Sequence, residues 1–133
     1  MDIKNRASNL SVLKDCNVIE GYLRIVLMEK TTVDDFKDLS FPELREVTGN
    51  IIFYRVRGLT SIGRLFPNLR VIRGEDLFMY YSLVVYKMFS LKEIALPGLT
   101  VLRGGVIISE NRGKSPVLFL FSHVKINYIP SSK

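Results

Sequence analysis

Few residues of this chain have the types and spacing that catalysis requires. Asp34 and Asp35 are adjacent acids, but nothing in the sequence around them indicates a pocket that would shift a pKa. The single histidine, His123, has no cysteine or acidic cluster near it. The sequence also shows no glycine-rich phosphate loop followed by lysine, no cluster of metal ligands and no Ser/His/Asp set. We therefore expect a protein that is not an enzyme and uses no cofactor or metal.

Two other residues could take part in covalent chemistry. Cys16 is the only cysteine, so it cannot form a disulfide within this chain, and a lone cysteine usually behaves as a small buried apolar residue. Asn9 begins the sequence Asn-Leu-Ser, which accepts N-linked glycans in secreted proteins. Asn9 is therefore a candidate glycosylation site for a secreted form.

An internal repeat sets the elements that must position any binding residues. Four hydrophobic runs each end at a glycine, and these glycines are 28, 25 and 30 residues apart. Three of the runs follow a Phe/Leu-Pro-x-Leu segment, in which proline fixes a turn and the leucine points inward. A repeat of this length is typical of a solenoid, whose coils bury their apolar faces against one another. The four glycines are Gly21, Gly49, Gly74 and Gly104.

Strand-like segments follow the repeat glycines. They lie at residues 22–27, 50–56, 77–85 and 105–109, and they are rich in β-branched and aromatic residues. Residues 7–15 have apolar residues at helical spacing, so we expect a short N-terminal helix there, with Ser8 as a candidate cap. The repeat and the strands together predict a parallel β-solenoid of about four coils.

Strand alternation divides these segments into an inner and an outer face. The inner residues predicted for the core are Leu23, Ile25, Ile51, Phe53, Val106 and Ile108. The outer residues are Arg24, Val26, Ile52, Tyr54, Ile107 and Ser109, with Met79 and Tyr80 in the longer third repeat. An exposed apolar row of this kind marks a partner site, whereas a row covered by the same chain would be a second core layer. The alternation pattern fits both interpretations.

Composition limits the classes of protein to which this chain could belong. The 133 residues, 47% hydrophobic and 24% charged, suit one folded domain. The net charge is +6, but the basic residues are scattered, which argues against a nucleic-acid partner. Residues 77–86, the longest charge-free stretch of interest, reach about half of the length of a membrane span, so we expect no membrane insertion. Residues 1–6 lack the apolar core of a secretory signal, which fits either a cytosolic protein or a piece whose leader lies elsewhere.

Residues 1–111 resemble a known receptor domain. The runs DIKN from residue 2, CNVIEG from 16, DLSFP from 38 and LFPNLRVIRG from 65 are similar to the first ligand-binding L domain of the insulin receptor and insulin-like growth factor receptor family. L domains of epidermal growth factor receptors are less similar. The resemblance implies a right-handed parallel β-helix, similar to leucine-rich repeats. It also implies an extracellular ligand-binding module without a catalytic domain, whose full-length parent would be a receptor tyrosine kinase.

The resemblance further implies the partners and the site. In this family the central sheet binds an insulin-like peptide together with a helix from the end of the receptor's own α-chain. The ligand-facing positions that carry over are Asp2, Lys4, Asn5, Val26, Leu27, Ile52, Tyr54, Arg55, Phe78, Met79, Tyr80, Tyr81, Tyr86 and Lys87. Arg24 joins them from strand alternation.

Some positions differ from the family pattern. Lys87 replaces an acidic residue, Glu29 replaces an aromatic residue of the insulin receptor, and Ile107 replaces a basic residue. Charge reversals at the edge of an interface change partner choice more than fold. We therefore expect either a divergent insulin-like ligand or weak binding.

The resemblance ends near residue 111. We expect an incomplete receptor L domain at 1–111 and a divergent tail at 112–133 that packs loosely. The family pairs the cysteine at Cys16 with one upstream of Asp2, so Cys16 is expected to be a free thiol. Two functions remain: a peptide-binding module, within a receptor or as a soluble decoy, and a structural remnant that does not bind.

Overall fold

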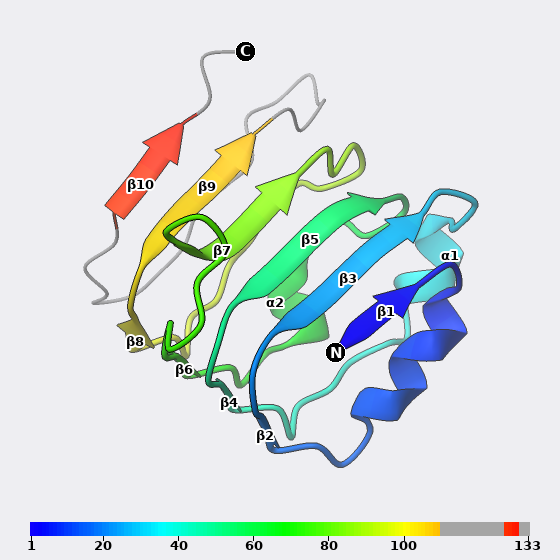
Figure 1. Ribbon diagram of the computed structural model, residues 1–133. Helices are drawn as coiled ribbons and strands as arrows, with labels where there is room; N and C mark the ends of the chain where they lie inside the picture. The colour runs from blue at the N-terminus through cyan, green and yellow to red at the C-terminus, as the bar shows by residue number, and fades with distance from the viewer. Residues whose placement is uncertain (110–126, 131–133) are drawn as a thin grey trace.

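The computed structural model describes residues 1–109 and the backbone of residues 127–130. The strands of this part form two parallel sheets (Figure 1). The large sheet contains, in spatial order, β1 (Asp2–Lys4), β3 (Leu23–Met28), β5 (Ile51–Val56), β7 (Tyr81–Tyr86), β9 (Gly105–Ser109) and β10 (Asn127–Pro130). The small sheet contains β2 (Val18–Ile19), β4 (Glu46–Val47), β6 (Val71–Ile72) and β8 (Val101–Leu102).

Each repeat contributes one short strand to the small sheet and one longer strand to the large sheet. Equivalent residues of successive repeats pair in register, as Leu23 does with Ile51 and Ile51 with Leu83. The predicted parallel ladder of β3, β5, β7 and β9 is therefore confirmed. The third strand is shorter than expected, because β7 begins at Tyr81 and residues 77–80 form a turn.

The core lies behind the large sheet, between it and the rest of each coil. All six residues predicted to point inward from the strands are buried. The leucine of each Phe/Leu-Pro-x-Leu segment is buried too, with Leu44, Leu69 and Leu99 at most 1% exposed. Phe66 contacts both Phe41 and Phe53, with ring centres 6.2 and 6.3 Å apart. One continuous apolar core thus joins the successive coils.

The expectation of a right-handed parallel β-helix is wrong. The structure has two open parallel sheets, and short helices and turns occupy the third side of each coil where a β-helix would have another sheet. The proline segments explain the difference. Pro42, Pro67 and Pro97 each begin a turn in the structure, and proline has no N–H to donate to a ladder.

Three short helices within residues 1–109 complete the coils (Figure 1). The 3₁₀ helix η1 spans Ala7–Leu13 beside β1, and its N-cap is Arg6, whose side chain makes no capping hydrogen bond, so the prediction of Ser8 as the cap is wrong. Helix α1 (Val33–Phe36) begins with a capping box between Thr32 and Asp35. Helix α2 (Ile62–Leu65) has Ser61 as its N-cap, and the Ser61 hydroxyl accepts a hydrogen bond from the backbone N–H of Arg64 at 3.2 Å.

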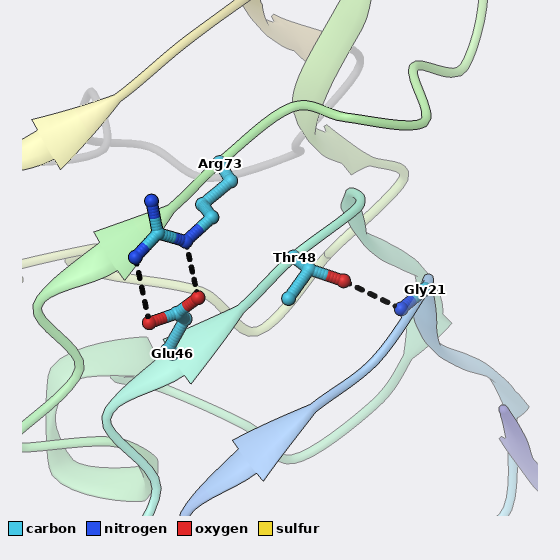
Figure 2. A network of polar contacts seen from close by, with 4 residues as sticks. All are labelled: Gly21, Glu46, Thr48 and Arg73. Carbon is cyan, nitrogen blue, oxygen red and sulfur yellow. Dashed lines mark hydrogen bonds and ion pairs between the residues drawn. The ribbon is translucent and has the colours of Figure 1, made fainter.

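Polar contacts join neighbouring coils at the small sheet (Figure 2). The Arg73 guanidinium donates two hydrogen bonds to the carboxylate of Glu46, one coil earlier, and this contact raises the pKa of Arg73. The Gly21 N–H donates to the hydroxyl of Thr48 at 2.8 Å. The repeat glycine Gly74 is required by its backbone: its φ is +66°, and a Cβ there would lie 2.0 Å from the Arg103 carbonyl oxygen.

Three further expectations concern Cys16, the tail and membrane insertion. Cys16 is a free thiol that packs against the core but stays only half-buried, so it is less buried than predicted. The expectation for the tail at 112–133 falls outside the described residues, apart from the backbone of β10 beside β9. None of the helices in the described residues is long and apolar enough to cross a membrane.

Candidate functional site

The outer face of the large sheet, opposite the core, carries the candidate site. Strand register aligns two rows of outward residues across it. The first row is Asp2, Arg24, Ile52, Val84 and Ile107. The second row is Lys4, Val26, Tyr54, Tyr86 and Ser109. Because each row crosses five parallel strands, residues far apart in sequence lie side by side on one surface.

The middle of the first row is apolar and covered by its neighbours. Ile52 and Val84 are each only 7% exposed, yet neither belongs to the core cluster behind the sheet. Ile52, which strand alternation predicted to face outward, is thus nearly covered, and Ser109 at 9% exposure is also buried. The outer face has an apolar floor with more exposed side chains around it.

Stacked tyrosines dominate the second row. The rings of Tyr54 and Tyr86 are parallel within 11°, with centres 5.5 Å apart. The guanidinium carbon of Arg55 lies 5.5 Å from the Tyr54 ring centre, and Lys87 Nζ lies 5.3 Å from that of Tyr86. Cation–π contacts and stacking hold the two rings in one orientation. Tyrosine is enriched among the residues that carry most of the binding energy of protein interfaces.

A third row follows the tyrosines and has a strained backbone. Asn5, Leu27, Arg55 and Lys87 come directly after the second-row residues of four neighbouring strands, and their φ angles are +75°, +56°, +51° and +53°. Residues with a Cβ rarely adopt this left-handed conformation, and such strain gathers at functional sites. The positive φ angles interrupt the extended backbone near the end of each strand. Leu27 is 43% exposed at this position.

A turn at residues 77–80 adds the most exposed apolar side chains. Met79 is 70% exposed and Tyr80 is 85% exposed, and both have positive φ. The backbone N–H and C=O groups of Phe78 and Tyr81 bond to each other, at 2.9 and 2.8 Å, which closes the turn. Asn50 holds the segment before it, because its side-chain amide donates to the Asp76 carbonyl at 2.8 Å. In Figure 1 this turn arches over the near face of the large sheet, in front of β7.

The N-terminal corner of the face is built from charged and aromatic groups. The Tyr22 hydroxyl donates to Asp2 Oδ2 at 3.0 Å, and the Arg24 guanidinium carbon lies 4.3 Å from the Tyr22 ring centre. The hydrogen bond to Asp2 and its negative charge raise the pKa of Tyr22. Arg24 also lies 6.0 Å from the Phe78 ring, which links this corner to the turn.

The structure brings every residue predicted for the site to this face or its edge. Sequence reasoning missed Val84, because it placed the outward positions of the third repeat at Met79 and Tyr80. Aligning β7 with β5 would have found it, since Val84 pairs with Ile52. Tyr22 was also missed. Asn9 lies on η1, exposed, and its Nδ2 donates to the Lys4 carbonyl at 2.7 Å.

This geometry can bind but offers little for catalysis. The described residues contain no group of three or more acidic, histidine or cysteine side chains that could hold a metal ion. The face instead presents stacked rings, an apolar floor and cations at its edge. The sequence comparisons agree with this description: residues 15–129 match the family of receptor L domains, which are non-catalytic modules.

Three relatives place the protein more closely. It is 50% identical over 112 residues to an insulin-like peptide receptor of Branchiostoma lanceolatum, and 49% identical over 112 residues to an insulin-like growth factor 1 receptor of Xenopus laevis. It is 47% identical over 113 residues to the insulin receptor-related protein of Homo sapiens. Each match covers 84% of this chain but only 8 or 9% of the relative. The chain belongs to the receptor L domains of the insulin receptor family.

Proposed function

We propose that the outer face of the large sheet binds an insulin-like peptide, together with a helix from the end of a receptor α-chain. The relatives are named as receptors for insulin-like peptides and growth factors, which supports this class of ligand. The proposed place of action is extracellular, within a receptor or as a soluble decoy. The observation that carries the proposal is that strand register and the turn at 77–80 bring the stacked tyrosines and four exposed apolar side chains to one side of the large sheet.

Exposure and rigidity both favour this face as an interface. Leu77, Phe78, Met79 and Tyr80 are between 39 and 85% exposed, and they form one contiguous turn. A cluster of large exposed apolar residues in a soluble domain marks a partner site. The stacked Tyr54 and Tyr86 are already ordered, so binding costs less side-chain entropy there. A peptide hormone with an apolar surface would cover the turn and the tyrosine pair together.

Isothermal titration calorimetry tests the proposal. The full 133-residue protein would be titrated with insulin-like growth factor 1, with and without a synthetic peptide that reproduces the helix at the end of a receptor α-chain. We expect heat of binding that strengthens when the helix peptide is present, because both would share one face. Calorimetric silence at high micromolar concentrations, with a folded protein, would support the structural remnant instead.

A further inference from the structure

A small polar pocket lies at the carboxyl ends of β3 and β5, beside the proposed binding face. It has a volume of about 260 Å³ and is lined by Glu29, Arg55, Arg57 and Phe89. Two arginines and one glutamate give this lining one net positive charge. The pocket therefore differs in chemistry from the apolar floor of the outer face.

Each arginine of the pocket packs against an aromatic ring. The guanidinium carbon of Arg57 lies 5.5 Å from the Phe89 ring centre, and that of Arg55 lies 5.5 Å from the Tyr54 ring centre. A ring against the flat face of a guanidinium orients it but leaves its N–H donors, which point outward in its plane, free for other acceptors. Arg57 can still offer a planar pair of donors to a carboxylate.

The glutamate of the pocket does not use these donors fully. Arg55 Nη1 lies 3.4 Å from Glu29 Oε1, a long contact between side chains that are 39 and 54% exposed, so this ion pair is weak. Arg55 Nε is buried without an acceptor among the described residues. The exposed Arg57 guanidinium likewise has no acidic partner in the part of the molecule that the structure describes.

Backbone contacts hold the main chain at the two arginines. The Arg57 N–H donates to the Met28 carbonyl at 2.9 Å, and the Thr31 hydroxyl donates to the Arg57 carbonyl. Arg55 has a φ of +51°, which belongs to the strained row at the edge of the binding face. Each guanidinium thus extends from a fixed point on the main chain, and its neighbouring ring limits its orientation.

We propose that this pocket takes one carboxylate of the bound peptide, held between Arg57 and Arg55. The assignment rests on the proposed function, because it supplies the peptide that would reach the pocket from the tyrosine pair. A single carboxylate fits the single net charge, and Glu29 disfavours a phosphate or sulfate with two charges. Phe89 provides an apolar wall for the carbon atoms next to the carboxylate.

Nuclear magnetic resonance of the arginine side chains tests this assignment. The full ¹⁵N-labelled protein would be titrated with three short probes: Ac-Gly-Glu-Phe-Gly-NH₂, the same peptide with Gln in place of Glu, and the Gln peptide with a free C-terminal carboxylate. We expect the Nε–Hε signals of Arg57 and Arg55 to shift with a carboxylate probe and not with the neutral one. The two acidic probes distinguish a glutamate carboxylate from a C-terminal one.

Matched variants distinguish binding in the pocket from a general effect of positive charge on the protein. Arg57→Gln should weaken binding of the stronger acidic probe about fivefold, whereas Arg57→Lys, which keeps the charge but not the planar fork, should fall in between. Arg45→Gln removes an exposed arginine near the small sheet and should change nothing. The backbone amide spectrum of each variant confirms that it is folded.

The outcomes are separable from those of the calorimetric test. Equal shifts with the neutral and acidic probes, no Arg57 shift at millimolar probe, or equal losses in Arg57→Gln and Arg45→Gln would each overturn the pocket assignment. If calorimetry still detects the insulin-like peptide, only the pocket assignment fails. If the pocket binds the acidic probe but calorimetry is silent, only the peptide-binding function fails.

Discussion

At the scale of single residues, two neighbours on β5 have opposite roles. Tyr54 points out from the sheet, half-buried, and stacks on Tyr86. Phe53 points inward, is 0% exposed and contacts Phe66 with ring centres 6.3 Å apart. Because strand side chains alternate, one residue step separates the proposed binding surface from the core. Substitutions at these positions should therefore affect different measurements.

Tyr54→Ala should weaken binding of the insulin-like peptide by about 1–3 kcal/mol, the range for a central aromatic anchor, with little change in melting temperature. Calorimetry measures the affinity, and Tyr54→Phe serves as a control because it keeps the stacked ring. If Tyr54→Ala instead unfolds the protein while affinity per folded molecule stays constant, Tyr54 belongs to the core and the outer-face assignment is wrong.

Phe53→Ala should lower the free energy of unfolding by about 3–5 kcal/mol, because it leaves a cavity between the sheet and Phe66. Urea denaturation followed by circular dichroism measures this change. The affinity of the molecules that remain folded should stay unchanged. A loss of affinity without a loss of stability would show that Phe53 contacts the ligand.

At the scale of elements, the repeat spacing predicted the parallel strands, and sequence alternation predicted which of their residues are buried. Neither pattern predicted the third side of each coil, because turns and one-turn helices are too short to show a periodic pattern of apolar residues. The sequence also predicted a strand at residues 77–80, which form a turn in the structure. Met79 and Tyr80 adopt positive φ there without the glycine or asparagine that usually indicates it. Tertiary contacts, such as the bond from Asn50 to Asp76, hold this turn.

Gly74→Ala should destabilise the fold by more than about 1 kcal/mol, because alanine resists positive φ. Its Cβ would also meet the Arg103 carbonyl oxygen at 2.0 Å. Gly98→Ala is the matched control, since its nearest contact would be 3.4 Å and its φ is not positive. Urea midpoints compare the two variants. Equal effects would show that the coil corner can rearrange and that the glycine is not required.

At the scale of the whole molecule, stacking of coils turns scattered residues into one surface. The site residues come from five strands and one turn, and no short motif contains them. The resemblance to the family indicated most of the site residues, and strand register explains why they meet. The sequence could not predict how exposed these residues are: Ile52 lies on the outer face but is only 7% exposed. The arginine pocket is formed only by the fold.

Chemical-shift mapping of the full protein with insulin-like growth factor 1 tests the central claim most directly. The account predicts that amide signals shift at outer-face positions, including Tyr54, Tyr86 and Met79. Signals on the small sheet, such as those of Val18 and Val71, should stay in place, because that surface faces another direction. Shifts confined to the small sheet, or no shifts at saturating peptide, would contradict it.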